Sequence, residues 1–266
     1  MLKLRIISAI IGIPLILGAV YLGGPWYALL VGLLSLLGVH EYLNMNRTGG
    51  YNLPATGLYL GVSLIVGTAL TGRLDLIYPV LTAVFITLNL GLLAGYKKGS
   101  FLESALSLWG IIYLGGLGGY LILIRLLPRG IAATGILLLN VWGYDICAYF
   151  AGIKWGSHKL APLISPQKSV EGALAGSLAA VILSVAAALL FPLQLAPLKA
   201  GSAAVFALGV SLFSQLGDLL ESALKRQTAV KDSGNLIPGH GGVLDRFDSL
   251  WLAAPFAFYF FLYIYR

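Results

Sequence analysis

The sequence has few charged residues and one cysteine. Of its 266 residues, 10% are Asp, Glu, Lys or Arg and 59% are hydrophobic, whereas soluble domains have about 25% charged residues. A chain of this composition could not cover its surface with polar groups in water, and its hydrophobicity excludes disorder. Cys147 is the single cysteine, so an internal disulfide is excluded. The mean hydropathy of +0.91 therefore predicts an integral membrane protein.

Acidic residues are scarcer than basic ones. The chain has 17 Lys and Arg against 10 Asp and Glu, a net charge of +7. Basic runs with interleaved aromatic residues are absent, so nucleic acid is not an expected partner. Cationic cytoplasmic loops facing anionic membrane lipids explain the excess.

Long apolar runs predict an all-α, polytopic integral membrane protein with about nine transmembrane helices. These runs cover residues 5–23, 26–44, 51–71, 75–95, 103–126, 130–152, 172–192, 201–222 and 244–265. With the N-terminus inside, twelve of the 17 Lys and Arg residues lie on the cytoplasmic side. The positive-inside rule then predicts a cytoplasmic N-terminus, in the inner or plasma membrane if the chain is bacterial.

Polar residues are concentrated in the second half of the chain. Seven of the ten acidic residues fall within 145–266, around two long loops at about 153–171 and 223–243. Both loops are cytoplasmic in this topology. We therefore expect residues 1–128 to be a transmembrane scaffold and residues 129–266 to be the catalytic region. Its polar site is expected at the cytoplasmic ends of the C-terminal helices.

Two acidic residues lie where a predicted span meets a polar loop. Asp218 is about one turn inside the end of its helix, and Asp245 is at the start of the last one. A carboxylate inside a span is costly and indicates function. Two carboxylates at one membrane depth repel each other unless a cation lies between them. Hard oxygen ligands of this kind suit Mg²⁺ together with substrate phosphates, so the pair predicts a metal site.

The segment between these two acids predicts a polyphosphate site. Gly239, Gly241 and Gly242 free the backbone to turn N–H groups onto an anion. Four cations surround them, namely Lys225, Arg226, Lys231 and Arg246. His240 is expected to be a donor to phosphate or a general acid/base. With no second histidine and no cysteine nearby, zinc is disfavoured.

Several neighbouring residues keep two interpretations. Glu221 and Lys225 have the favourable i,i+4 order and fit a purely structural ion pair as well as a site. Asp248 is either a helix-terminal cap or a site residue. Asp145 lies within an apolar run and needs a partner or a metal. Lys168 precedes a predicted helix and fits either phosphate binding or membrane anchoring.

Five further polar residues have a structural interpretation. Lys154 and Lys159 are expected to anchor the membrane interface, and Glu171 to be an acid at a helix N-terminus. His40 and Glu41, in the second span, are expected to be interfacial or helix-pairing residues.

Residues 222–248 resemble the signature of a known family, the phosphatidate cytidylyltransferases or CDP-diacylglycerol synthases. The segment is S-A-L-K-R-Q-T-A-V-K-D-S-G-N-L-I-P-G-H-G-G-V-L-D-R-F-D, which fits throughout. The resemblance continues upstream through Gln215-x-Gly217-Asp218, the Asp145/Ala148-Tyr149-Phe150-x-Gly152 stretch and the Ser165-Pro166-x-Lys168 loop. Cys147, Ile153 and Gln167-Lys168-Ser169 depart from the usual pattern, which affects fine contacts around that loop.

The resemblance implies transfer of CMP from CTP to phosphatidic acid in the membrane, giving CDP-diacylglycerol and pyrophosphate. It implies Mg²⁺ as cofactor, leaves open a second cation such as K⁺, and implies a homodimer. The implied metal ligands are Asp218, Asp245 and Asp145. The implied catalytic residues are Asp218, Asp245, Lys225, Arg226, His240 and Asp248. The implied nucleotide-binding residues are Lys168, Ser222, Lys225, Arg226, Lys231, Gly239, Gly241, Gly242 and Arg246.

Three alternatives have different requirements. The first is a CTP-dependent lipid kinase, which the presence of the whole signature disfavours. The second is a cytidylyltransferase with another lipid acceptor, such as a polyprenol or an archaeal ether lipid. A cation-coupled transporter predicts acids near the middle of the bilayer, whereas these acids gather toward the cytoplasmic ends.

Overall fold

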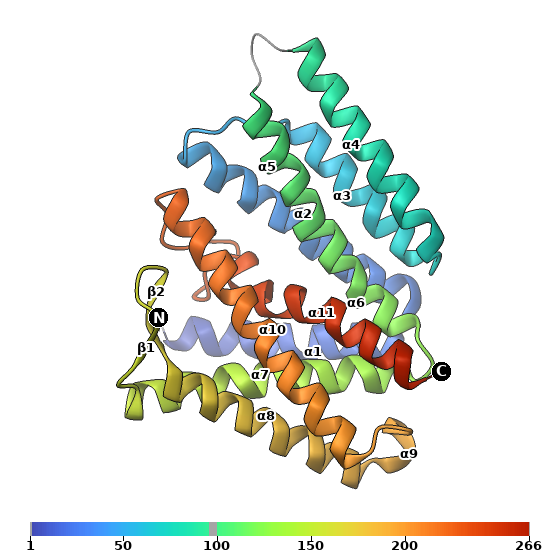
Figure 1. Ribbon diagram of the computed structural model, residues 1–266, viewed down its shortest axis with the longest axis vertical. Coiled ribbons are helices and arrows are strands. Elements are labelled where there is room, and N and C mark those ends of the chain that lie inside the picture. The colour runs from blue at the N-terminus through green and yellow to red at the C-terminus, as the bar shows by residue number, and fades with distance from the viewer. Residues whose placement is uncertain (1, 96–99, 266) are drawn as a thin grey trace. The chain divides into compact units, whose positions relative to one another are not determined.

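The computed structural model describes residues 2–95 and 100–265, and these are mostly helical (Figure 1). This confirms the predicted all-α class. The chain divides into two compact units, Met1–Leu123 with Lys225–Arg246, and Ile124–Leu224 with Phe247–Arg266. The N-terminal unit thus includes the end of α10 and the start of α11. The predicted roles of residues 1–128 and 129–266 as scaffold and catalytic region remain predictions.

The first unit is built from helices of the N-terminal half. They are α1 (Leu2–Leu22), α2 (Gly24–Thr48), α3 (Ala55–Leu70), η1 (Leu74–Leu76), α4 (Ile77–Ala94), α5 (Phe101–Ile111), the π-helical η2 (Ile112–Gly116) and the first part of α6 (Leu117–Leu126). Buried polar contacts tie them together, because no water competes for these groups inside an apolar bundle. Ser35 on α2 donates to the carbonyl of Leu114 at 3.0 Å, and Tyr42 donates to that of Leu106 at 2.8 Å.

The second unit contains the hairpin and most of the C-terminal helices. Its elements are α7 (Gly130–Trp155), β1 (Lys159–Ala161), β2 (Ser165–Ser169), α8 (Val170–Leu190), α9 (Pro192–Leu195) and the greater parts of α10 (Ala200–Gln227) and α11 (Leu244–Ile264). Helices α7 and α8 run side by side along their length, and the hairpin joins them at one end (Figure 1). Asn140 on α7 and Ser184 on α8 exchange hydrogen bonds of 2.7 and 3.0 Å across this interface.

Each of the nine predicted spans is mostly helical, but the bounds differ; in the third span, residues 51–54 precede the helix that begins at Ala55. Among the described residues, seven helices are long and apolar enough to cross a membrane. The first and third predicted spans correspond to shorter apolar helices, Ile7–Leu22 and Ala55–Leu70. The membrane class is therefore supported, whereas the count of nine spans remains a prediction.

The loop predicted at 153–171 contains structure that the sequence analysis missed. Helix α7 continues to Trp155, and residues 159–169 form the antiparallel pair β1–β2. The Ser169 side chain then caps α8 by accepting the Gly172 N–H at 3.1 Å. A three-residue strand is too short for the alternation of polar and apolar residues by which strands are recognised, so the pattern gave no signal.

Candidate functional site

The first candidate region is the polar loop of residues 228–243, which connects α10 to α11. Gly239 and Gly241 have φ angles of +77° and +85°. Side chains other than glycine rarely adopt this left-handed region, so the two glycines permit the tight turn. The turn is closed by the Ile237 N–H, which donates to the Gly241 carbonyl at 2.9 Å.

The Asp245 carboxylate binds both ends of this loop. Its Oδ1 accepts the Lys225 ammonium at 2.6 Å. Its Oδ2 accepts the Ser233 N–H and hydroxyl, both at 2.9 Å, and the Gly242 N–H at 3.0 Å. The Asp245 side chain is 8% exposed, so this charge depends on its partners for stabilisation. Asp245 therefore holds the loop against the end of α10.

Glu41 binds the same loop from α2. Its buried carboxylate accepts the N–H groups of Val243 at 2.8 Å and of Leu244 at 2.9 Å. The Ser233 hydroxyl also lies 3.1 Å from Glu41 Oε2. The sequence analysis missed this role and expected an interfacial or helix-pairing residue. Asp218 was singled out because an acidic residue inside a membrane span indicates function. The same argument could have singled out Glu41.

The predicted cations and the histidine have other surroundings than the two carboxylates. The Arg246 Nε donates to the His240 carbonyl at 2.9 Å. The His240 ring is positioned from α1, since its Nδ1 lies 2.7 Å from the Ser8 hydroxyl. Arg226 and Lys231 are exposed. These cations are therefore accessible, while the two carboxylates that bind the loop, Glu41 and Asp245, are mostly buried.

The second candidate region lies in the other unit and centres on Asp218. Its Oδ2 pairs with the Lys168 ammonium of β2 at 2.6 Å, and the Ser222 hydroxyl lies 3.3 Å from its Oδ1. The two side chains of the ion pair are 35% and 20% exposed. A group approaching from outside can therefore reach Asp218 more readily than Asp245. The structure thus gives Lys168 an acidic partner that the sequence analysis did not identify.

Acidic residues gather around Asp218 within this unit. The buried Asp248 is within electrostatic range of Asp218, Glu221 and Asp145. Asp248 is the fifth residue of α11 and accepts the Ser249 N–H at 2.7 Å, which does not fit the alternative of a helix-terminal cap. A Cβ atom at Gly217 would collide with the Asp248 carbonyl. The glycine therefore permits the close approach of α10 and α11 beside the acids.

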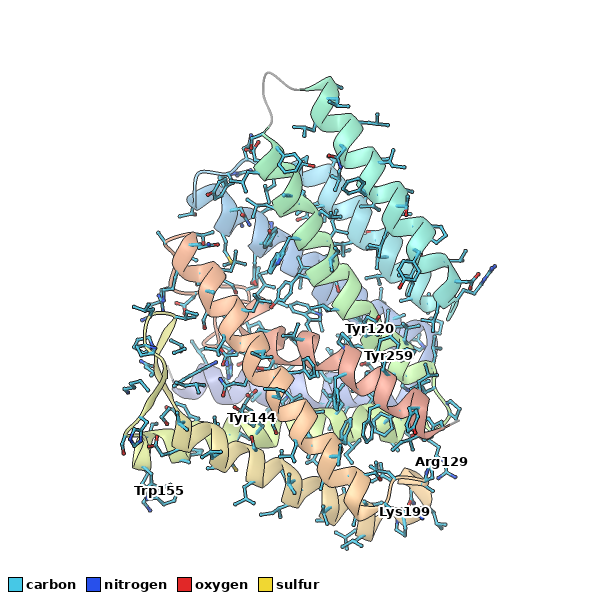
Figure 2. All side chains as sticks on the ribbon, in the orientation of Figure 1. Tyr120, Arg129, Tyr144, Trp155, Lys199 and Tyr259 are labelled. Atoms are coloured by element: carbon cyan, nitrogen blue, oxygen red, sulfur yellow. The ribbon has the colours of Figure 1, made fainter. Side chains whose placement is uncertain are left out.

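Tyr144 on α7 completes the polar surroundings of Asp218. Its hydroxyl donates to the Gln215 side-chain oxygen of α10 (Figure 2). Asp145 and Asp218 both lie within electrostatic range of this tyrosine. Gln215 and Asp145, both from stretches that resemble the family signature, therefore share Tyr144 as a neighbour.

The acidic side chains near Asp218 are donors of the type that magnesium takes. Asp218, Asp248, Glu221 and Asp145 supply hard carboxylate oxygens, with one of them paired to Lys168. In the described part of the chain, no group of three or more His, Cys, Asp or Glu side chains has the arrangement of a metal site. The chemistry of the donor set fits Mg²⁺, and the assignment of Asp218, Asp245 and Asp145 as ligands remains a prediction.

The hairpin between α7 and α8 is fixed by Glu171. Its carboxylate accepts the N–H groups of Ser157 and His158 at 3.1 Å and lies 2.6 Å from the His158 Nδ1. Glu171 is thus an acid in the first turn of α8, as predicted, and it also holds the start of the hairpin. Because Lys168 lies in β2, this anchor helps to fix the partner of Asp218.

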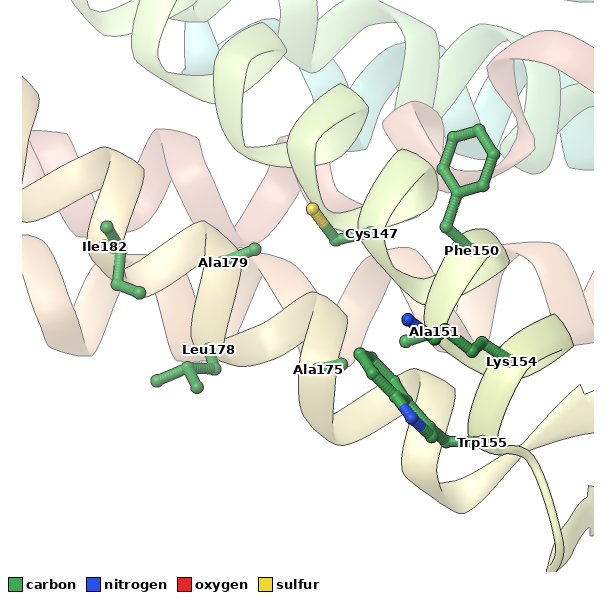
Figure 3. A pocket seen from close by; sticks show the side chains of 9 residues that line it. All are labelled: Cys147, Phe150, Ala151, Lys154, Trp155, Ala175, Leu178, Ala179 and Ile182. Atoms are coloured by element: carbon green, nitrogen blue, oxygen red, sulfur yellow. The ribbon is translucent and has the colours of Figure 1, made fainter.

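A groove of about 380 Å³ lies between α7 and α8. Figure 3 shows Lys154 and Trp155 near one end and Ile182 toward the other, with Cys147 between the helices. The Lys154 ammonium lies 4.9 Å from the centre of the Trp155 ring. The interfacial role of Lys154 remains a prediction. The groove contains no residue of either candidate region.

Comparison with known proteins identifies the family. The model of the cytidylyltransferase family matches residues 3–264. A phosphatidate cytidylyltransferase of Synechocystis is 34% identical to this chain, with 96% of this chain and 95% of the relative aligned. Those of Staphylococcus saprophyticus and Staphylococcus aureus are 35% and 32% identical, with 96% of each chain aligned. The family resemblance predicted from residues 222–248 is thereby confirmed, and the chain belongs to the cytidylyltransferase family.

Proposed function

We propose that this protein transfers CMP from CTP to phosphatidic acid, giving CDP-diacylglycerol and pyrophosphate for phospholipid biosynthesis. The observation that carries the proposal is the similarity to phosphatidate cytidylyltransferases along 96% of the chain. The apolar helices support a site next to membrane lipid. Each of the two polar regions contains acidic and basic groups, which the transfer of a nucleotide from a nucleoside triphosphate requires for charge stabilisation.

The reaction needs no covalent intermediate with the protein. A phosphate oxygen of phosphatidic acid attacks the α-phosphorus of CTP, and the bond from that phosphorus to the oxygen leading to the β-phosphorus breaks. The electron pair leaves with pyrophosphate. Catalysis then consists of positioning the two phosphates and stabilising their charge, as in phosphoryl transfer generally.

We assign Asp218 and Asp245 as Mg²⁺ ligands, with Asp145 as a further ligand. When bound, the ion supplies charge stabilisation for the triphosphate and the leaving pyrophosphate. Lys168 and Lys225 each lie 2.6 Å from one of these carboxylates, so both ammonium groups are held close to the expected position of the phosphates. Ser222, beside Asp218, contributes a hydroxyl.

Cationic side chains in and beside the loop are proposed to bind the remaining negative charge of the triphosphate. Arg226, Lys231 and Arg246 are exposed cations there, and His240 offers a ring nitrogen to a phosphate oxygen. The turn at Gly239 and Gly241 lets the loop approach the anion closely. The Gly242 N–H already donates to Asp245, so its contribution is to the shape of the loop.

The membrane arrangement belongs to the same proposal. The distribution of Lys and Arg favours a cytoplasmic N-terminus, so that CTP reaches the site from the cytoplasm and phosphatidic acid from the inner leaflet. We further propose a homodimer and a second cation such as K⁺. Labelling of cysteines introduced into loops 49–53 and 228–243 should place both on the side opposite to 71–74 and 127–129, in a Cys147→Ser background. If the introduced cysteines of all four loops were labelled from the same side of the membrane, this topology would be contradicted.

One assay tests the reaction itself. Purified protein in detergent is incubated with Mg²⁺, CTP carrying label in the cytidine or in the γ-phosphate, and one lipid acceptor, which is phosphatidic acid, a polyprenol or an ether lipid. Cytidine label in the lipid supports the proposal. Label from the γ-phosphate in the lipid indicates a lipid kinase, and cytidine transfer only to a polyprenol or an ether lipid indicates another acceptor. Either result would overturn the proposed reaction.

A further inference from the structure

We infer that Glu41 is a positioning residue that holds the glycine-rich loop in the form that binds CTP, an inference that rests on the proposed function. Glu41 lies on α2, in the half of the chain expected to be scaffold. Its carboxylate nevertheless contacts the loop at three points, through Val243, Leu244 and Ser233.

The carboxylate of Glu41 acts at the start of α11. The first N–H groups of a helix have no acceptor within the helix, and a negative charge there is favourable. Glu41 Oε1 accepts the Val243 N–H at 2.8 Å and Oε2 accepts the Leu244 N–H at 2.9 Å. Because Glu41 is 2% exposed, these bonds form away from competing solvent. The loop therefore ends at a fixed position.

Ser233 links Glu41 to the second carboxylate of the loop. Its hydroxyl lies 3.1 Å from Glu41 Oε2 and 2.9 Å from Asp245 Oδ2. The two carboxylates therefore hold the beginning of the loop, at Ser233, beside its end at residues 242–244. We call this arrangement of Glu41, Ser233 and Asp245 the carboxylate clasp.

Two glycines of the signature are explained by the clasp. A Cβ atom at Gly234 would lie 2.5 Å from Glu41 Oε1, and one at Gly242 would lie 2.6 Å from Glu41 Oε2. Neither position has room for a side chain while Glu41 stays in place. A Cβ atom at Gly242 would lie still closer to the Ser233 hydroxyl, so these glycines make room for both Glu41 and Ser233.

The clasp also indicates which groups of the loop are left to bind CTP. The N–H groups of residues 242–244 donate to Asp245 and Glu41, so these donors are occupied by carboxylates. The cationic side chains then carry the interaction with the triphosphate, and the clasp fixes where they emerge. Without Glu41, the loop spends less time in this form and CTP binds only to the fraction that retains it, which raises the apparent KM for CTP.

The test compares Glu41→Gln with a matched control, Glu103→Gln. Glu103 also accepts two backbone N–H groups, from Asn52 at 2.8 Å and Ser100 at 3.0 Å, but it caps α5 and does not contact the loop. We expect Glu41→Gln to raise the KM for CTP by about 10- to 100-fold, as positioning contacts typically do. The KM for phosphatidic acid should stay unchanged. Glu103→Gln should leave both constants near the wild-type values.

Amide hydrogen exchange provides a readout that does not depend on turnover. Peptides covering residues 233–247 should exchange faster in Glu41→Gln, while peptides from α7 and α8 keep wild-type rates. Glu41→Asp retains the charge and should partly restore both the exchange protection and the KM. A lower kcat with unchanged KM for CTP and unchanged loop exchange would overturn the inference, because it would indicate only a loss of folded enzyme.

A second variant covers the case in which Glu41→Gln does not fold. Ser233→Ala removes the hydroxyl between the two carboxylates and keeps both acids, so it should raise the KM for CTP in the same direction by a smaller factor. An unchanged KM in Ser233→Ala would then count against the clasp. If wild-type protein transfers no cytidine to phosphatidic acid, the proposed function fails, whereas the exchange experiment still decides whether Glu41 orders the loop.

Discussion

The ammonium group of Lys168 lies 2.6 Å from Oδ2 of Asp218 and joins β2 to α10. The two residues are 50 positions apart in the sequence, and each was singled out there for a different reason. Asp218 was a candidate metal ligand, and Lys168 was a candidate for phosphate binding or membrane anchoring. Their contact places a cation beside the carboxylate on which the proposed chemistry depends.

Removing this ammonium group should weaken both stability and CTP binding. Lys168→Met removes the ammonium group that pairs with Asp218 and leaves this carboxylate in an acidic environment with Asp248 and Asp145. Because the pair is only partly exposed, we expect a loss of about 1–3 kcal/mol in the free energy of unfolding. The kcat/KM for CTP should also fall. Thermal unfolding in detergent and steady-state kinetics measure the two effects.

Lys159→Met is the control for this variant, since Lys159 is an exposed lysine on the paired strand β1. Lys168→Arg keeps the positive charge and should lie between wild type and Lys168→Met. Equal effects of Lys159→Met and Lys168→Met would show that the Asp218 contact has no specific role.

Replacing either proposed metal ligand should nearly abolish activity. We expect Asp218→Asn and Asp245→Asn each to lower kcat by at least about 100-fold. This is a larger loss than substitution of a residue that only contacts a metal ligand typically causes. Asp218→Asn should leave the fold intact, because Asp218 is the more exposed of the two. Asp245→Asn should also loosen the loop, since Asp245 binds Lys225, Ser233 and Gly242.

Titration with Mg²⁺, after removal of metal with a chelator, distinguishes metal binding from other roles of these two acids. Asp232→Asn is a suitable control because Asp232 is an exposed acid of the same loop. Wild-type Mg²⁺ dependence in either Asp218→Asn or Asp245→Asn would show that the assignment of that ligand is wrong.

Ser8 should influence activity only through His240. The Ser8 hydroxyl lies 2.9 Å from the Leu4 carbonyl and 2.7 Å from the His240 Nδ1, so it links the imidazole ring to α1. Ser8→Ala should therefore release the ring and lower kcat/KM by up to about tenfold. In a His240→Ala background the same substitution should have no effect, which a double-mutant cycle measures.

The control for Ser8→Ala is Ser177→Ala on α8. The Ser177 hydroxyl also donates to the carbonyl four residues earlier, that of Ala173, at 2.9 Å. It should leave the kinetics unchanged. Equal losses for Ser8→Ala with and without His240 would refute a role for Ser8 in orienting the ring.

Gly217 should be intolerant of a side chain. A Cβ atom there would collide with the Asp248 carbonyl, so Gly217→Ala should force α10 and α11 apart and cost about 1–3 kcal/mol. Gly135→Ala, on α7, has no atom within 4 Å of the added Cβ, and should be neutral or stabilise the helix by about 0.5–1 kcal/mol. Thermal unfolding of both variants measures the difference, and equal stability of the two would contradict the close helix contact.

Much of this protein could be predicted from local sequence. Hydropathy gave the helical membrane class, because the apolar length of each segment is a property of neighbouring residues. The family followed from the uninterrupted segment Ser222–Asp248. The hairpin β1–β2 could not be predicted in this way, because its strands are short and are fixed by contacts such as that of Glu171 with Ser157 and His158.

The sequence by itself determined that the chain lies in a membrane, that it belongs to the cytidylyltransferase family and which acidic and basic residues are candidates for its chemistry. Only the tertiary structure decided how these residues are paired. Lys168 binds Asp218, and Lys225 binds Asp245. Glu41 binds Leu244 across 203 positions of sequence. Hydropathy and signature patterns depend on near neighbours in the chain, whereas a buried carboxylate takes whichever donors the packing of distant helices brings to it.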